Sequence, residues 1–219
     1  MARLCSSRFE RQARAAGFLF IAGLDEAGRG CLFGPVYAGA VILDPAKPIR
    51  GLDDSKALEP EVREALFDHI QRRAIAWSVA WCGPDEIDRI NIYQASRLAM
   101  RRALDALQPV PDFLLVDALR LETSIEQKPL IHGDARCRSI AAASIVAKVC
   151  RDRAMANFEA RYPGYGLARH KGYATPEHRR ALTELGPTPE HRMSFMPVRI
   201  AAGLEPAQTA LEFEAAPCP

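Results

Sequence analysis

The chain has 219 residues, of which 48% are hydrophobic and 26% are charged, and its formal net charge is +2. This length suits one large domain or one domain with a small appendage, and the composition is that of an ordinary globular protein. No run approaches the roughly 18 apolar residues that span a bilayer. The Arg-rich first segment also lacks the apolar stretch of a signal peptide. We therefore expect no membrane partner.

The cysteines are scattered and show no C-x-x-C spacing. This pattern argues against a zinc site and against a secreted disulfide framework. We therefore expect the protein in the reducing cytoplasm.

Charge is unevenly distributed along the chain. Between Ala135 and Arg199 there are 12 Lys and Arg against 5 Asp and Glu. Such a local excess is typical of a surface that binds a polyanion. A solvated face whose counter-charges lie elsewhere in the fold is the alternative, and charge alone does not separate the two.

Hydrophobic patterning predicts alternating strands and helices in an α/β arrangement. The expected strands are Phe18 to Leu24, Val36 to Leu43, Ala74 to Cys82, Phe113 to Val116 and Pro129 to Ile131. The expected helices are Glu61 to Arg73, a short one after Pro84, Tyr93 to Leu107, Ser139 to about Arg161, and one that starts after Pro176 and closes near Gly186. The first connection is too short for a crossover helix, so we expect the first three strands to form an antiparallel meander. The pattern predicts a mixed sheet flanked by helices and followed by a smaller helical C-terminal section.

Acidic residues stand at the ends of three apolar runs. Asp25 and Glu26 follow the first, Asp117 ends the fourth, and Asp134 follows the fifth. Singly, each has an ordinary explanation, because Asp often caps a turn and an Asp before a helix often caps that helix. Together they form an oxygen-only ligand set, which suits Mg²⁺ or Mn²⁺. Two such ions could support in-line hydrolysis of a phosphodiester.

Asp25 and Glu26 are neighbours on a strand, so both could face one site only if the pleat breaks there. We expect Gly28-Arg29-Gly30 to supply that break and to let a ligand approach the backbone closely. A dinucleotide-binding motif is disfavoured, because the glycine spacing is wrong and the segment leads into a strand.

Further polar residues could hold a phosphate backbone. Ser144, Lys148 and Arg151 share one face of the long helix, as a phosphate-binding edge or as a solvent face, although Lys148 could instead pair with Asp152. Two loops have a similar character. They are the aromatic and cationic loop that contains Lys171 and Tyr173, and the weaker polar loop around Lys56.

Taken together, these segments resemble the type 2 ribonucleases H, and within them the bacterial ribonuclease HII family. The resemblance runs in order from about Phe9 to Val198. The matching segments are Gly23-Leu-Asp-Glu-Ala-Gly-Arg-Gly30, Gly34-Pro-Val36, Asp54-Ser-Lys56, Ile87-Asp-x-x-Asn91, Val116-Asp117, Gly133-Asp134, Ser139-Ile-Ala-Ala-Ala-Ser-Ile-Val-Ala-Lys148, Arg151-Asp-Arg153, His170-Lys-Gly-Tyr173 and His191-Arg-x-Ser-Phe195.

The resemblance implies a ribonuclease H-like fold, with a mixed five-stranded sheet flanked by helices and a C-terminal helical extension. We accordingly expect a catalytic core over residues 1–160, the extension over 161–200 and a flexible tail over 201–219. It also implies an endonuclease that cleaves the RNA strand of RNA–DNA hybrids and incises 5′ to single ribonucleotides in duplex DNA. The products would carry 5′-phosphate and 3′-hydroxyl ends.

The resemblance also assigns roles to residues. Two divalent ions, Mn²⁺ or Mg²⁺, would be held by the catalytic carboxylates Asp25, Glu26, Asp117 and Asp134. The Gly-Arg-Gly segment would read the 2′-hydroxyl, and Tyr173 would pack against the following deoxyribose. The full expected substrate-binding set is Gly28, Arg29, Gly30, Lys56, Ser144, Lys148, Lys171 and Tyr173.

Two positions depart from the family pattern. Ala118 stands where the family more often has Gly, and Arg136 where it more often has Lys. Two other classes remain open, namely a nucleic-acid-binding protein without catalysis and a DNA-directed nuclease of the same fold. We expect a monomer, because no segment of the sequence indicates a partner subunit. Gln208 to Glu214 is a faint match to a sliding-clamp peptide and lacks its paired aromatic residues.

Overall fold

The computed structural model of the chain describes residues 5–205. Five strands form one sheet in the order β3-β2-β1-β4-β5. The strands are β1 (Ile21–Ala27), β2 (Val36–Ile42), β3 (Ala76–Cys82), β4 (Phe113–Asp117) and β5 (Glu126–Leu130). The helices are α1 (Arg8–Ala15), α2 (Pro60–Arg73), α3 (Pro84–Asp105), α4 (Arg138–Arg161), α5 (Leu167–His170), α6 (Pro176–Leu185) and α7 (Met196–Ala201).

The sheet is mixed, as expected. The strands β1, β2 and β3 form an antiparallel meander, whereas β4 and β5 run parallel to β1. The parallel strands β1 and β4 are joined through a long connection that contains β2, β3, α2 and α3. The strands β4 and β5 are also parallel, although residues 118–125, which join them, are no more numerous than those that join the antiparallel pair β1 and β2. The carboxyl ends of β1, β4 and β5 therefore meet at one edge of the sheet.

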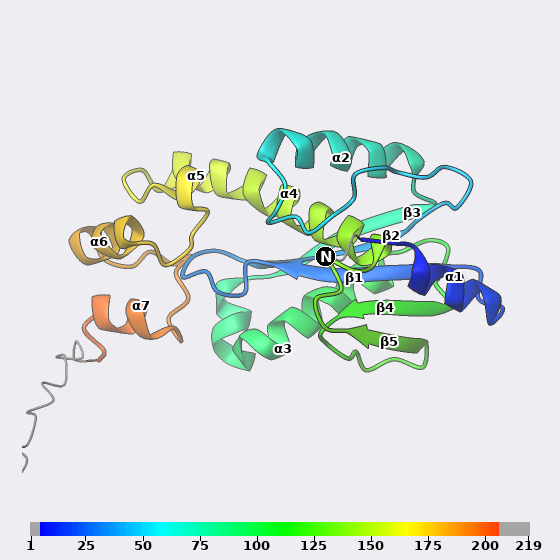
Figure 1. Ribbon diagram of the computed structural model, residues 1–219. Coiled ribbons are helices and arrows are strands. Elements are labelled where there is room, and N and C mark those ends of the chain that lie inside the picture. Colours follow the sequence, from blue (N-terminus) through cyan, green and yellow to red (C-terminus); the bar gives the residue numbers. More distant parts are fainter. Residues whose placement is uncertain (1–4, 206–219) are drawn as a thin grey trace, which may run out of the picture.

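Helices cover both faces of the sheet (Figure 1), with α4 and α2 on one face and α3 on the other. The long helix α4 lies unusually close to the strands because two glycines give it room. A Cβ atom at Gly23 would come within 2.0 Å of the Ser139 backbone, and one at Gly39 within 2.3 Å of the Ala143 carbonyl oxygen. This close approach brings the middle of α4 to the end of β1.

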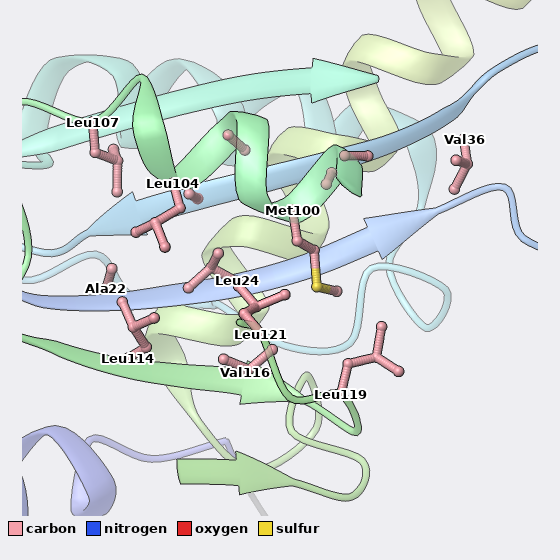
Figure 2. Packing of buried hydrophobic residues seen from close by; sticks show 14 of the residues in the cluster. Ala22, Leu24, Val36, Met100, Leu104, Leu107, Leu114, Val116, Leu119 and Leu121 are labelled. Atoms are coloured by element: carbon pink, nitrogen blue, oxygen red, sulfur yellow. The ribbon is translucent and has the colours of Figure 1, made fainter. Parts of the chain in front are cut away.

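The main hydrophobic core fills the space between the sheet and α3. Figure 2 shows Met100 and Leu104 of α3 above Leu24 of β1 and Val116 of β4, all buried. Burying a side chain of this size contributes about 1.5–3 kcal/mol, so this packing anchors the strand ends that carry the acidic residues.

Within α3, Asn91 has a non-helical backbone with φ of 66° and ψ of 162°. Its side-chain oxygen accepts a hydrogen bond from the Gln94 amide over 3.1 Å, as the N-cap of a second helix would. The expectation of a short helix after Pro84 and a separate one from Tyr93 is therefore confirmed, although the second ends at Asp105 and not at Leu107.

The extension packs on the loop between β1 and β2. Phe33 is buried with Met155, Tyr165 and Leu167, and it forms an isolated β-bridge with His191. Figure 1 shows α5, α6 and α7 gathered at one end of the molecule. The expected boundary at residue 160 falls in the last turn of α4.

Several boundaries differ from those expected. Strand β1 begins and ends three residues later than predicted, and it remains paired through Ala27, which lies opposite Tyr37. The predicted break in the pleat at Asp25 and Glu26 is therefore wrong, because the chain leaves the sheet only after both residues. The break is also not needed to bring the two acids near one site, since the charges of Glu26 and of Asp117 both act on Asp25. Helices α1, α5 and α7 were not predicted. Helix α7 ends at Ala201, where the tail was expected to begin.

No helix within residues 5–205 is long and apolar enough to cross a membrane. The suggested clamp peptide and most of the expected tail lie outside the described residues.

Candidate active site

The acidic residues meet at the edge where the parallel strands end. In the register of the sheet, Leu24 lies opposite Val116, and Asp117 lies opposite Leu130. The residues that follow Leu24 therefore lie beside Asp117. Asp134 comes four residues after the end of β5, in the turn that leads to α4.

Asp25 is the most buried of the four, with 3% of its surface exposed. Burial raises the pKa of its carboxyl well above the usual value, and the charges of Glu26 and Asp117 raise it further. Ser144 of α4 acts in the opposite direction through a hydrogen bond to this side chain. The ionised form of Asp25 is therefore costly in the free protein.

Glu26 and Asp117 show the same tendency, each with a partial offset. Burial raises the pKa of Glu26, and Arg29 opposes the shift from 3.3 Å. Burial also raises the pKa of Asp117, although its Oδ1 accepts a hydrogen bond from the Gly133 amide over 2.6 Å.

Asp134 does not cap the helix that follows it. Its Oδ1 accepts a hydrogen bond from the Ala135 amide, and its Oδ2 lies 3.4 Å from Lys56 Nζ. The N-cap of α4 is Cys137, and Glu10 of α1 accepts the amide hydrogen bond of Ser139 over 2.7 Å. The cap explanation for Asp134 is therefore wrong, which leaves its carboxylate facing the other acids.

The polar loop around Lys56 joins the same site. Ser55 and Ser144 share a hydrogen bond of 2.7 Å between their hydroxyl oxygens, which fixes the loop to α4. Burial lowers the pKa of Lys56, but Asp134, Asp54 and the other acids outweigh it, so the net shift is upward. Lys56 is thus a cation whose charge is stabilised beside the carboxylates.

The donor set suits a hard divalent cation. All four side chains offer oxygen, their charges act on one another, and the buried Glu26 Oε2 accepts no hydrogen bond. Within the described residues, however, no group of three or more His, Cys, Asp or Glu side chains has the arrangement of a formed metal site. The carboxylates are therefore neighbours that a cation would draw together, and burial of an unpartnered carboxylate oxygen is costly until that happens.

Two buried arginines, Arg151 and Arg192, pack against the Gly-Arg-Gly segment. Gly28 has φ of +93°, and a Cβ atom there would lie 2.0 Å from Arg151 Nε. The guanidinium of Arg192 donates to the carbonyl oxygens of Gly28 and Arg29, each over 2.8 Å. At Gly30, in contrast, an added Cβ atom would meet no other atom within 4 Å, so this residue faces open space.

Tyr173 borders this segment through an isolated antiparallel bridge with Cys31. Tyr173 is 37% exposed, and the Lys148 ammonium lies 5.9 Å from the centroid of its ring. The Lys171 carbonyl accepts a hydrogen bond from Arg151 over 2.8 Å. The structure therefore brings together the Gly-Arg-Gly segment, Tyr173 and Lys148.

The stripe on α4 is not a solvent face. Arg151 is fully buried and Ser144 is 3% exposed, whereas Lys148 forms the predicted helical ion pair with Asp152 over 2.6 Å. Five of the 12 basic residues between Ala135 and Arg199 form ion pairs, but only Glu64 and Glu205 among their partners lie outside this part of the chain, so most of the basic excess remains. The ion-paired residues are Lys148, Arg153, Arg161, Arg169 and Arg199.

Comparison with known proteins identifies the family. The ribonuclease HII family model matches residues 22–198. The chain belongs to the ribonuclease HII family. A ribonuclease HII from Solibacter usitatus is 60% identical over 195 residues, which cover 89% of this chain and 86% of the relative. The chain is accordingly an endonuclease of the ribonuclease H class.

Solved structures agree with this fold. The ribonuclease H2 of Pyrococcus horikoshii superposes with a TM-score of 0.72 at 27% identity, covering 84% of this chain and 98% of the other. Bst-RNase HIII in complex with Mn²⁺ has a TM-score of 0.67 at 19% identity, covering 88% and 72%, and supports the fold alone. Divalent-metal dependence is a property of the ribonuclease H family.

The two departures from the ribonuclease HII pattern have local explanations. Ala118 has φ of +47°, a left-handed conformation that glycine adopts at lower cost, which accounts for the family preference. Arg136 donates to the Ile131 carbonyl over 2.8 Å and lies over the Phe9 ring. Neither side chain contacts the four carboxylates.

Sequence reasoning missed two residues that shape this ribonuclease HII site and gave a third, Arg151, a role on an outer face of α4 that it does not have. Arg192 donates to the carbonyl of Gly28, the buried Arg151 donates to the carbonyl of Phe33, and Glu10 accepts the Ser139 amide at the start of α4. Their local sequence resembles that of exposed charged residues. For Arg192 the available signal was that it falls within a segment that resembles the family.

Proposed function

We propose that the chain hydrolyses the RNA strand of RNA–DNA hybrids and incises 5′ to single ribonucleotides in duplex DNA, leaving 5′-phosphate and 3′-hydroxyl ends. Family membership supports the first activity. The observation that carries the proposal is the set of buried, mutually repelling carboxylates beside an open glycine segment.

Asp25, Glu26, Asp117 and Asp134 would hold two divalent ions, either Mg²⁺ or Mn²⁺. Bound there, such ions supply an activated water and stabilise the leaving oxygen of the phosphodiester. The protein's own contribution is to fix these carboxylates at the ends of three strands and to place Lys56 next to Asp134. In that position Lys56 would contact a substrate phosphate.

The substrate choice would come from Gly28, Arg29 and Gly30. Gly30 has no neighbour that blocks an approaching ligand, so the backbone there can contact a sugar directly. A 2′-hydroxyl both donates and accepts hydrogen bonds, and it is the group that separates RNA from DNA. Tyr173, half exposed beside this segment, would pack against the next deoxyribose.

The other expected substrate contacts are assigned by position. Lys148 lies over Tyr173 and would meet a phosphate together with Lys171. Ser144 is buried beside Asp25. It would therefore contribute to substrate binding through the Asp25 carboxylate and not through direct contact with the nucleic-acid backbone.

A cleavage assay on three substrates tests the proposal. The substrates are a duplex with one ribonucleotide, a full RNA–DNA hybrid and an all-DNA duplex, each with and without Mg²⁺ or Mn²⁺. We expect metal-dependent cleavage of the first two only. Asp25→Asn should reduce this cleavage at least about a thousandfold, because a ligand and a charge are lost.

Asp68→Asn is the matched control, because it makes the same change at an exposed site on α2. Wild-type activity in Asp25→Asn would refute the metal mechanism. Cleavage of all-DNA duplex would refute the role of Gly28 to Gly30, and binding without any nicking would make the chain a binding protein.

We also propose that the chain acts as a monomer in the cytoplasm. Every residue invoked above comes from one chain, and the cysteines of the described region are free thiols. Light scattering of the purified protein tests the first point, and fractionation of cells tests the second.

A further inference from the structure

Three buried histidines lie in the extension, and the proposed reaction uses none of them. His170, His178 and His191 are 9%, 0% and 1% exposed. The rings of His170 and His178 stack with their centroids 4.4 Å apart, and Nε2 of His178 lies 3.2 Å from Nε2 of His191. Buried polar groups of this kind need partners for every nitrogen.

The hydrogen bonds fix the tautomer of each ring. The Thr188 amide donates to Nδ1 of His191 over 3.0 Å, so that nitrogen carries no proton and Nε2 does. Nε2 of His191 therefore donates to Nε2 of His178. The proton of His178 must then lie on Nδ1.

The hydrogen bond between His178 and Tyr173 independently places the His178 proton on Nδ1. Nδ1 of His178 lies 2.9 Å from the Tyr173 carbonyl oxygen, which can only accept. Both rings are consequently neutral and each has one defined tautomer. A second proton on either would set two N–H groups against each other.

His170 follows the same rule beside them. The Gly172 amide donates to its Nδ1 over 3.2 Å, so its Nε2 donates to the Tyr165 carbonyl over 2.7 Å. Its own carbonyl accepts the amide of Tyr173 over 2.9 Å. The backbone of Tyr173 is thus held on both sides by histidine residues.

The same segment of the extension also holds the glycine segment. His191 packs edge-on against Phe33, with ring centroids 4.9 Å apart. The next residue, Arg192, donates to the carbonyls of Gly28 and Arg29. One short stretch, Thr188 to Arg192, therefore fixes two segments that would contact the substrate.

We propose that His191 and His178 are positioning residues that set Tyr173 relative to the Gly28–Gly30 segment. They act through a directed chain of hydrogen bonds that runs from Thr188 through His191 and His178 to the Tyr173 carbonyl. This inference rests on the proposed function, because Tyr173 and Gly28 to Gly30 are its substrate contacts.

The chain of bonds can be tested without any activity. Long-range proton–nitrogen NMR spectra of the imidazoles distinguish the two neutral tautomers in the free protein. We expect Nε2–H at His191 and Nδ1–H at His178 at neutral pH. The opposite tautomer at either ring, or a charged ring, would overturn the proposal.

A double-mutant cycle tests the positioning role. His178→Leu removes the donor to Tyr173 at similar volume, and we expect kcat/KM on the one-ribonucleotide duplex to fall about tenfold or more. In a Tyr173→Ala background the same change should have less than about a twofold effect. His178→Asn, whose amide occupies the place of Nδ1, should recover most of the loss.

The outcomes separate this inference from the function on which it rests. Equal effects of His178→Leu with and without Tyr173 would overturn the positioning role, and so would full activity in Tyr173→Ala. If His178→Leu does not fold, His191→Leu, which removes the Nε2 donor to His178, takes its place in the cycle. A wild-type protein that cleaves no ribonucleotide-containing duplex would overturn the proposed function, and the NMR spectrum would still decide whether the chain of bonds exists.

Discussion

Gly28 and Gly30 stand two residues apart, yet their surroundings differ. Gly28 has a positive φ, and a Cβ atom there would clash with the Arg151 guanidinium, whereas Gly30 does not have a positive φ and an added Cβ atom would meet open space. Gly28 is therefore required by the fold. Gly30 is free of any such requirement, so a need for glycine there would come from the substrate.

Alanine substitutions should separate these two roles. We expect Gly28→Ala to lower the free energy of unfolding by about 2 kcal/mol or more, through backbone strain and the clash with Arg151. Gly30→Ala should change it by less than about 0.5 kcal/mol and yet reduce cleavage at least about tenfold. Thermal unfolding and the one-ribonucleotide assay measure both. A Gly30→Ala protein that is destabilised, or fully active, would contradict the role assigned to Gly30.

The carboxylate cluster should cost stability in the absence of metal. Because the pKa of Asp25 is raised in the folded state, its favourable contribution is lost as pH rises through that pKa, and the ionised group destabilises the fold near neutral pH. Asp25→Asn should therefore raise the free energy of unfolding by about 1 kcal/mol at about pH 7, and the melting temperature by about 2–4 °C.

Thermal melts with chelator and with Mg²⁺ provide the check. The ion should stabilise the wild type more than Asp25→Asn, since it binds the folded carboxylates. Asp68→Asn serves as the control and should show neither effect. A lower melting temperature for Asp25→Asn in chelator would mean that the cluster is not strained.

The residues of the site were only partly predictable. Apolar runs that end in acids indicated that Asp25, Asp117 and Asp134 belong to one ligand set. The parallel pairing of β1, β4 and β5, which brings their ends to one edge, was not predicted. Their burial and the role of Lys56 depend on how closely α4 approaches the sheet. That approach is set by Gly23 and Gly39, whose importance appears only once the helix is placed on them.

At the scale of elements, α4 depends on a residue distant in sequence. Glu10 of α1 accepts hydrogen bonds from the amide and the hydroxyl of Ser139 and from the thiol of Cys137. A carboxylate at the N-terminus of a helix compensates the unpaired amides and the helix dipole. Helix α1 thereby fixes the start of the helix that carries Ser144 to Asp25.

Removing this carboxylate should destabilise the protein measurably. We expect Glu10→Ala to lower the free energy of unfolding by about 1–2 kcal/mol, and Glu10→Gln by less, because an amide oxygen still accepts the bond. Urea unfolding measures the change. Glu61→Ala, an exposed acid in the first turn of α2, should stay within about 0.5 kcal/mol. Equal effects at both positions would refute the special role of Glu10.

Elements with buried apolar residues were predicted correctly, whereas polar or very short elements were missed. The three strands of the meander were found because their runs are apolar and their first connection is short. Most of β5 was missed because Glu126–Leu130 is a polar edge strand, with only its last residue buried. Helices α5 and α7 have four and six residues, too few for a periodic pattern to emerge.

At the scale of the whole molecule, the extension and the sheet form one packed unit around the loop after β1. Arg192 of the extension donates to the Gly34 carbonyl, Arg151 of α4 donates to the Lys171 carbonyl of the extension, and Phe33 lies in the cluster that the extension buries. The proposed division at residue 160 would separate these partners and leave buried carbonyls without donors, at a cost of about 1–3 kcal/mol for each group. We therefore expect the two parts to unfold together.

Protonation of the buried histidines at low pH should show whether the sheet and the extension unfold together. Burial, together with the neighbouring His178, lowers the pKa of His191 from 6.5 to about 3. A folded-state pKa below the unfolded value gives stability that is fully present above about pH 6.5 and is lost as pH falls toward about 3. The slope that one such group contributes is at most about 1.4 kcal/mol per pH unit.

Urea unfolding between about pH 4.5 and 7.5, followed by the fluorescence of Trp77 and Trp81 in β3, tests both points. We expect the wild type to lose stability faster on acidification than His191→Gln, which has no imidazole to protonate. The carboxylates at the strand ends have raised pKa values and shift stability the opposite way, but they are the same in both proteins and cancel in the difference. His69→Gln, on α2 and outside the histidine chain, should follow the wild-type curve. Parallel curves for wild type and His191→Gln would show that the tryptophans of the sheet do not report protonation in the extension, and the two parts would then unfold separately.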